Sequence, residues 1–155
     1  MLITLVGMPA SGKSTTGKCL AIELAYQFID LDTEIEKQTS ESIAILFQRV
    51  GEARFREIER DILLQNLHHQ NTVLALGGGT PCFKDNMQEI VSNSLCIYLL
   101  ANLREVSKRL AYAQPLQRPM FAHLSEREVQ ERLEQLYEQR HPYYAQAHVF
   151  LVKGV

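Results

Sequence analysis

A short glycine-containing stretch near the N-terminus constrains the fold more than any other part of the sequence. Residues Gly7 to Ser14 read G-M-P-A-S-G-K-S, which has the pattern G-x-x-x-x-G-K-S. The apolar residues 2–6 precede it, and a helical pattern follows from residue 13. A strand, this loop and a helix in that order form the phosphate-binding P-loop. The sequence therefore predicts an α/β domain that binds a nucleotide.

Each part of this loop has a physical task in holding phosphate. Gly7 and Gly12 let the backbone curl closely around phosphate oxygens, and free N–H groups of the loop and helix point at the anion. We expect Lys13 to be exposed in the empty cleft and to reach the β- and γ-phosphates, and the Ser14 hydroxyl to bind Mg²⁺. The predicted nucleotide-binding residues of the loop are Gly7, Ala10, Ser11, Gly12, Lys13, Ser14 and Thr15.

Size and charge exclude several classes of partner. A chain of 155 residues is long enough for one domain with a sizeable core. Its net charge of −2 and the lack of a run of like charges argue against nucleic acid and anionic membrane surfaces. No apolar run approaches the roughly 20 residues that span a membrane. The three cysteines, Cys19, Cys82 and Cys96, are far apart and odd in number, which favours a reducing cytoplasm.

Strand-like and helical patterns alternate along the chain. This order predicts a parallel sheet covered by helices, and the absence of a linker or repeat predicts a single domain over residues 1–155. The predicted strands are 2–6, 27–29, 72–76, 95–100 and 148–152. The predicted helices are 13–25, 33–38, 42–50, 52–68, 102–111 and 125–141.

Two segments are predicted to be functional loops. Gly77, Gly78 and Gly79 follow a predicted strand, at the sheet edge where ligands of open α/β sheets bind, so we favour a ligand-binding loop over a plain turn. Residues 111–124 contain two prolines that interrupt any helix, and they include Arg118. The next helix begins at Ser125 with a capping box.

The predicted strand 72–76 ends without the acidic residue that usually assists Mg²⁺ in P-loop proteins. Asp30 and Asp32 follow another short strand instead, and residues i and i+2 of an extended segment point the same way. Both carboxylates could face the cleft, where one would assist Mg²⁺ and the other would accept a proton from an attacking hydroxyl. The sequence favours equally the alternative that Asp32 only caps the following helix.

Three further charged residues are ambiguous when taken alone. Arg56 and Glu59 are three residues apart on a predicted helix, where an ordinary surface ion pair is the usual outcome. Arg140 lies at the end of the last long helix, where the helix dipole favours a positive charge.

Taken together, the motifs resemble those of shikimate kinase, and the resemblance covers nearly the whole chain. The order and spacing of the motifs are jointly specific, although only the first is specific by itself. They are the P-loop from Gly7 to Thr15, Asp30-Leu31-Asp32, Gly51-Glu52-x-x-Phe55-Arg56-x-x-Glu59, Gly77-Gly78-Gly79, Arg118-Pro119 and Arg140-x-Pro142-x-Tyr144.

The resemblance implies a fold and an activity. The fold is a P-loop three-layer sandwich with a five-stranded parallel sheet of order 2-3-1-4-5, flanked by helices and fitted with a mobile lid over 112–124. The substrate-binding region is 33–60. The reaction is phosphorylation of the 3-hydroxyl of shikimate by ATP, with one Mg²⁺ per subunit, a step toward chorismate and the aromatic amino acids. We expect a cytoplasmic monomer.

The resemblance also assigns roles to residues. Asp32 resembles the aspartate that binds the substrate hydroxyls and acts as base, and Asp30 the one that holds Mg²⁺ through water. Arg56 and Arg140 match the pair that grips the substrate carboxylate. Lys13, Asp32 and Arg118 form the implied catalytic set, with Arg118 on the lid and Arg109 against adenine. The remaining implied substrate contacts are Phe47, Phe55, Glu59, Gly77, Gly78, Gly79 and Pro119.

Two other functions compete with this one. A P-loop kinase of another small metabolite, such as gluconate, would not need the set of Asp32, Arg56 and Arg140. A nucleotide-binding module without catalysis would have lost Lys13, Asp32 or one arginine, and all are present. Ser40 stands where the family often has glycine. The family usually continues through a loop against adenine and a terminal helix, whereas this sequence ends at Val155.

Overall fold

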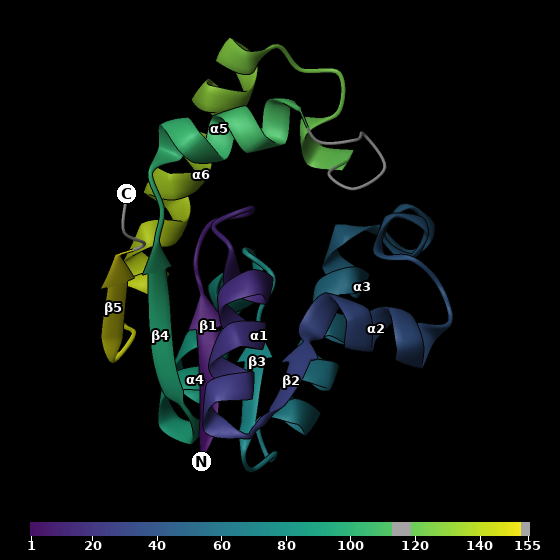
Figure 1. Ribbon diagram of the computed structural model, residues 1–155. Coiled ribbons are helices and arrows are strands. Elements are labelled where there is room, and N and C mark those ends of the chain that lie inside the picture. The colour runs from purple at the N-terminus through teal and green to yellow at the C-terminus, as the bar shows by residue number, and fades with distance from the viewer. Residues whose placement is uncertain (113–118, 153–155) are drawn as a thin grey trace.

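Five parallel strands form the centre of the computed structural model, which describes residues 1–112 and 119–152 (Figure 1). The order in the sheet is β2-β3-β1-β4-β5, and every neighbouring pair is parallel, so the predicted topology is confirmed. The strands are β1 (Leu2–Val6), β2 (Gln27–Asp30), β3 (Thr72–Ala75), β4 (Leu95–Leu100) and β5 (Val149–Val152).

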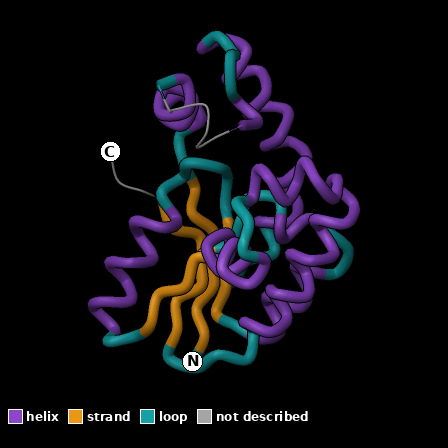
Figure 2. The backbone as a smooth tube through the Cα atoms, turned by 90° about the vertical axis from the view of Figure 1, so that its right-hand side faces the viewer, coloured by secondary structure: helices purple, strands orange, loops and turns teal. Residues whose placement is uncertain are grey.

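Helices cover both faces of this sheet, as Figure 2 shows from the side. On one face, α1 packs over a small core that contains Ile3, Leu5 and Val73. A much larger core on the other face includes Leu63, Ile90 and Leu133 from three further helices. The α-helices are α1 (Lys13–Leu24), α2 (Leu31–Thr39), α3 (Ile43–Asn66), α4 (Asn86–Asn93), α5 (Leu103–Ala111) and α6 (Glu126–Tyr144).

The central strand delivers the P-loop to its place. All five residues of β1 are buried, and β1 pairs with β3 on one side and β4 on the other. Its last residue, Val6, lies beside Tyr98, where the chain leaves the sheet at the carboxyl ends of the strands. That edge is where open α/β sheets bind their ligands.

The structure departs from the predicted elements in three places. Helix α4 was not predicted, although the apolar spacing of Met87, Ile90 and Val91 carries a helical signal over its eight residues. Helix α2 begins at Leu31, two residues earlier than predicted. Helix α6 continues past Pro142, because the Ala145 N–H still bonds the carbonyl of His141 at 2.8 Å.

Helix α3 contains a kink at Gly51, which has φ 78° and ψ 168°. Two successive helices were predicted on either side of this residue, and the non-helical backbone there confirms the break. The first half carries Phe47 and the second half carries Arg56, so the kink sets the angle between two parts of the candidate site.

The predicted lid over 112–124 is described only in part. Arg118 belongs to residues 113–118, which lie outside the described residues. The prolines were predicted to prevent any regular element, but Pro119–Phe121 form a short 3-10 helix, η2. Phe121 is buried in the larger core, so this end of the segment is attached to the domain.

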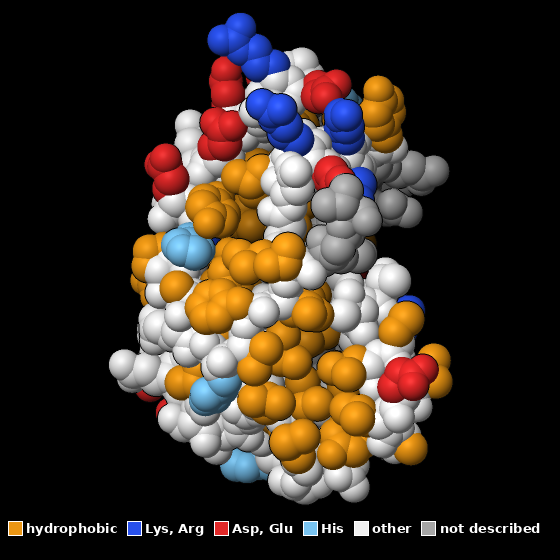
Figure 3. All heavy atoms as spheres, turned by 60° about the vertical axis from the view of Figure 1, so that its left-hand side comes forward, with side chains coloured by type: hydrophobic (Ala, Val, Ile, Leu, Met, Phe, Trp, Pro, Cys, Tyr) orange, Lys and Arg blue, Asp and Glu red, His pale blue; other side chains and the backbone are white. Residues whose placement is uncertain are grey.

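The edge strand β5 carries four consecutive exposed apolar residues. Among residues 1–112 and 119–152, β5 pairs with β4 alone and stands at the edge of the sheet. Figure 3 shows hydrophobic side chains gathered over this side of the molecule. Within the two described ranges, no helix combines the length and the apolar character that crossing a bilayer requires.

Because of the kink, we expect replacement of Gly51 by alanine to lower the stability of the domain, the opposite of its usual effect in a helix. Replacing glycine by alanine inside a helix usually stabilises it by roughly 0.5–1 kcal/mol. We expect Gly51→Ala to destabilise the domain by about 1–3 kcal/mol, because its φ and ψ lie in a region that suits glycine alone. No atom lies within 4 Å of the added Cβ, so the effect is conformational rather than steric. Urea unfolding measures it, and a stabilised Gly51→Ala variant would contradict the kink.

Candidate active site

The P-loop turns sharply between β1 and α1. Gly7, Ala10 and Gly12 all have positive φ, at 146°, 57° and 94°. A Cβ added to Gly7 would lie 2.8 Å from the carbonyl oxygen of Leu99 in β4, so the loop can pass this close to the sheet only as glycine. The turn opens α1 at Lys13, so the first N–H groups of the helix point back toward the loop.

Lys13 interacts with its own loop. Its Nζ donates hydrogen bonds to the carbonyl oxygens of Gly7 at 2.9 Å and Met8 at 2.8 Å. The prediction that Lys13 is exposed is wrong, because the side chain is half-buried. A partly desolvated ammonium group requires acceptors, and the curled backbone of the loop supplies them.

A second contact joins the P-loop to the end of β2. The Ser14 hydroxyl donates to Asp30 Oδ2 at 2.6 Å, and Asp30 Oδ1 accepts from the backbone N–H of Asp32 at 3.1 Å. Asp30 is therefore the N-cap of α2, which was the role considered for Asp32. A hydroxyl and a carboxylate this close offer the hard oxygen ligands that Mg²⁺ prefers, so these residues fit the ion.

Asp32 lies in the first turn of α2 and not in an extended segment. The argument from i, i+2 alternation is therefore wrong, because the helix begins at Leu31. Its half-buried carboxylate still reaches the glycine loop. A Cβ added to Gly77 would lie 3.2 Å from Asp32 Oδ1.

Two arginines meet at the same loop. A Cβ added to Gly79 would lie 2.5 Å from Arg56 Nη2, and one added to Gly78 would lie 2.8 Å from Arg140 Nη1. The second position is also 3.2 Å from the Cδ of Pro9, which belongs to the P-loop. Residues far apart in the sequence thus converge on residues 77–79, beside the phosphate-binding loop.

Glu59 lies beneath Arg56 and is only 2% exposed. Arg56 Nη1 is 2.6 Å from Glu59 Oε2, and the Thr80 hydroxyl donates to Glu59 Oε1 at 2.6 Å. The alternative of a surface ion pair is therefore wrong. Both carboxylate oxygens are engaged, which is what a buried charge requires.

Aromatic rings lie beside this pair. The ring centroids of Phe47 and Phe55 are 5.3 Å apart with an interplanar angle of 55°. Phe55 is buried, whereas Phe47 is 38% exposed. The Cζ of Arg56 is 5.4 Å from the Phe55 ring centroid, so the guanidinium has an apolar side as well as a charged partner.

A polar network behind the glycine loop was missed from the sequence, because it depends on α4. Asn86 is buried and donates from Nδ2 to the Thr80 carbonyl at 2.8 Å. Arg60 donates to Asn86 Oδ1 and forms an ion pair with Asp85 at 2.7 Å. The network holds η1 (Thr80–Cys82), the 3-10 turn that follows the glycines.

Cys82 lies in this turn, near both site arginines. Burial raises the pKa of its thiol to about 11, although the positive charges of Arg140 and Arg56 act in the opposite direction. The group therefore stays a neutral thiol at physiological pH and behaves as a packing residue.

Arg109 reaches the P-loop from α5. Its Nη1 donates to the Ala10 carbonyl at 3.3 Å, and its Nη2 is 3.6 Å from Glu105 Oε2. This places the arginine at the nucleotide side of the cleft. Arg118 lies outside the described residues, and Pro119 begins η2.

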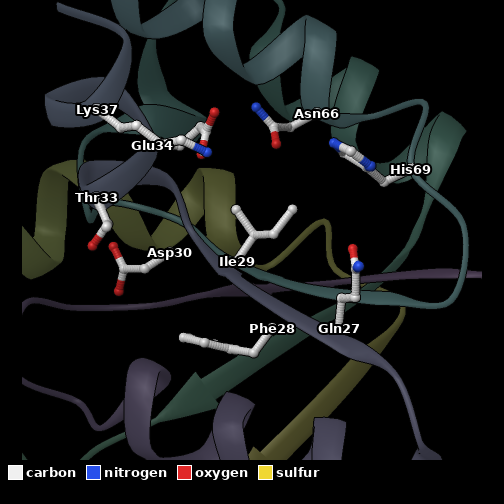
Figure 4. Close-up of a pocket in the computed structure, with 9 residues that line it drawn as sticks. All are labelled: Gln27, Phe28, Ile29, Asp30, Thr33, Glu34, Lys37, Asn66 and His69. Atoms are coloured by element: carbon white, nitrogen blue, oxygen red, sulfur yellow. The ribbon is translucent and has the colours of Figure 1, made fainter.

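A groove of about 430 Å³ runs along the outer edge of β2 (Figure 4). Asp30 and Thr33 lie at one end in the view, and Asn66 and His69 at the other. The groove shares Asp30 with the candidate site, but neither site arginine lines it. Among residues 1–112 and 119–152, no three His, Cys, Asp or Glu side chains gather to hold a metal, so an ion at Ser14 and Asp30 would take its other ligands from water and phosphate.

Sequence comparison identifies relatives of the whole chain. The family model for shikimate kinase matches residues 9–154. A shikimate kinase from Phocaeicola vulgatus is 37% identical over 149 residues, which cover 96% of this chain and 85% of the relative. One from Clostridium botulinum is 36% identical over the same shares of both chains.

Solved structures agree with the sequence relatives. Shikimate kinase from Bacteroides thetaiotaomicron superposes with a TM-score of 0.93 at 36% identity, covering 98% of this chain and 86% of that one. Shikimate kinase from Acinetobacter baumannii in complex with shikimate gives a TM-score of 0.89 at 30% identity, covering 99% of this chain and 84% of that one. The chain belongs to the shikimate kinase family.

Proposed function

We propose that this protein transfers the γ-phosphoryl group of ATP to the 3-hydroxyl of shikimate. The observation that carries the proposal is the convergence of Arg56, Arg140 and Asp32 on the glycine loop, beside the P-loop. Two guanidiniums and a carboxylate match an acceptor that carries one carboxylate and several hydroxyls. A P-loop next to them supports a phosphoryl donor.

On the nucleotide side, backbone N–H groups of the P-loop would hold the phosphates. Lys13 would exchange its bonds to the loop carbonyls for phosphate oxygens as charge moves onto the leaving group. Ser14 and Asp30 would hold one Mg²⁺ per subunit, with Asp30 acting through water. A Mg²⁺ held by these residues would supply positive charge that neutralises the phosphates.

On the acceptor side, Arg56 and Arg140 would hold the carboxylate through paired donors in planar forks. Asp32 would bind the reacting hydroxyl and take its proton. The hydroxyl oxygen then forms a bond to the γ-phosphorus, the bond from that phosphorus to the bridging oxygen breaks, and ADP leaves. Alignment and charge supply most of the catalysis in such a transfer.

The remaining assignments are proposed in the same way. Phe47, Phe55 and Pro119 would line the acceptor pocket, Arg109 would face adenine, and Arg118 would close over the phosphates. Glu59 acts through Arg56, which covers it. We propose a cytoplasmic monomer with residues 33–60 as its acceptor-binding region. All three cysteines are free thiols, which supports a reducing compartment.

The test is direct. Mass spectrometry of shikimate incubated with the protein, ATP and Mg²⁺ should show the gain of one phosphoryl group. Coupled ADP release should be fast with shikimate and slow with gluconate or without an acceptor. Preference for gluconate would favour another small-metabolite kinase, and nucleotide binding without ADP release would favour a non-catalytic module.

The arginine pair gives the first functional prediction. Arg56→Ala and Arg140→Ala should each raise the shikimate KM at least about tenfold, since a charge-assisted hydrogen bond contributes about 1.5–3 kcal/mol. The KM for ATP should stay within about twofold of wild type. Lysine at either position should rescue only in part, because a point charge lacks the planar fork.

Steady-state kinetics measures this effect, with Arg127→Ala as the matched control. Arg127 lies on the same helix as Arg140 and pairs with Glu131 on the surface. Unchanged shikimate KM in both site variants would mean that the carboxylate binds elsewhere.

Asp30→Asn should separate the proposed role of Asp30 in Mg²⁺ binding from its role as the N-cap of α2. Asparagine caps helices as well as aspartate does, so α2 should remain intact. The charge is lost, and we expect the Mg²⁺ concentration for half-maximal activity to rise about tenfold. A titration of activity against Mg²⁺ measures this, and an unshifted curve would exclude Asp30 from the metal site.

Asp32→Asn should affect chemistry rather than binding. The amide keeps the shape of the carboxylate but accepts no proton, so kcat should fall by about a hundredfold or more. Asp61→Asn, an exposed aspartate of α3, is the control and should leave kcat unchanged. A kcat for Asp32→Asn within threefold of wild type would rule out this residue as the base.

A further inference from the structure

Arg140 and Tyr144 are four residues apart on α6, so they lie on one face of the helix. Both side chains end at the same residue of the glycine loop, Gly78. The Tyr144 hydroxyl donates to the Gly78 carbonyl at 2.5 Å, although 66 residues separate them in the chain. Arg140 Nη1 lies 2.8 Å from the place where a Cβ on Gly78 would stand.

The two side chains also interact with each other. The positive charge of Arg140 acts on the Tyr144 phenol, although burial has the larger effect on its pKa. A phenol hydroxyl has one proton to donate, and here that proton goes to Gly78. The hydroxyl is therefore committed to the loop carbonyl, while the Arg140 guanidinium lies beside the same residue, Gly78.

The position of the hydroxyl is fixed by packing. Tyr144 is fully buried, and its ring lies 5.1 Å from that of Tyr98 between centroids. Burial raises the pKa of the Tyr144 phenol, so the group remains a neutral donor at physiological pH. The hydroxyl can neither ionise nor swing away, which gives the loop carbonyl a rigid partner.

We propose that Tyr144 is a positioning residue for the acceptor site, whose hydroxyl holds the Gly78 carbonyl and the Arg140 guanidinium in one arrangement. The proposal rests on the proposed role of Arg140 in binding the acceptor carboxylate. A preorganised site loses less conformational freedom when its ligand binds, so the hydroxyl should contribute to shikimate affinity without touching shikimate.

Tyr144→Phe tests the proposal, because it keeps the ring and removes only the hydroxyl. The matched control is Tyr98→Phe. Tyr98 is also a buried tyrosine, packs against Tyr144, and has its hydroxyl 3.3 Å from His141 Nδ1, away from the glycine loop. The two variants lose the same chemical group from the same core.

We expect Tyr144→Phe to raise the shikimate KM about threefold to tenfold, the effect of one hydrogen bond. The KM for ATP should stay within about twofold of wild type, and the melting temperature should fall no further than in Tyr98→Phe. Tyr98→Phe should leave the shikimate KM unchanged. Gly78→Ala, which forces Arg140 aside, should raise the shikimate KM in the same way.

A double variant shows whether Tyr144 acts through Arg140. In the wild-type protein, Tyr144→Phe changes log KM for shikimate by a certain amount. When Arg140 is already alanine, the same substitution should change log KM by less than half of that amount. Independent, multiplicative effects would overturn the proposal, as would an unchanged KM in Tyr144→Phe or an equal rise in Tyr98→Phe. If Arg140→Ala raises the KM and Tyr144→Phe does not, this inference alone fails. If neither variant raises the KM, the proposed role of Arg140 in binding the carboxylate fails with it.

Discussion

The lack of side chains at residues 77–79 is the constraint on which the rest of the site depends. Guanidinium nitrogens from α3 and α6 lie 2.5 and 2.8 Å from where Cβ atoms of Gly79 and Gly78 would be, and the Asp32 carboxylate lies close to Gly77. The backbone of these glycines is therefore the surface against which the charged groups are stacked. None of the three has positive φ, so it is space, and not backbone conformation, that requires glycine.

A buried charge accompanies this arrangement. Glu59 keeps both of its oxygens occupied by Arg56 and Thr80, and the network through Asn86 and Arg60 holds Thr80 in turn. Removing one partner of such a pair destabilises the fold far more than removing both, because the remaining charge stays buried without a partner. The proposed acceptor site is thus part of the folded core, and the contacts that position Arg56 also hold α3 and η1 together.

The sequence allowed most of the fold to be predicted, because the P-loop and the alternating strands and helices follow local rules. The convergence of Arg56, Arg140 and Asp32 was predicted only through the resemblance, since no spacing rule relates residues so far apart. Predictions from local sequence were wrong where tertiary contacts determine the position of a side chain. Asp32 entered a helix capped by Asp30, and Lys13 turned back to the loop carbonyls. Tyr144 was part of a noted motif, but the role proposed for it depends on its contact with Gly78, which no local pattern predicts.

The kink at Gly51 has a consequence for how such a protein can evolve. Residues before it carry Phe47 on an exposed surface, while residues after it are tied to the core through Glu59. Because the helical hydrogen-bond ladder is interrupted between them, substitutions in the first half need not propagate into the second. A lineage could therefore change the wall proposed for Phe47 to accept a different ring, while inheriting unchanged the arginine proposed to bind the carboxylate.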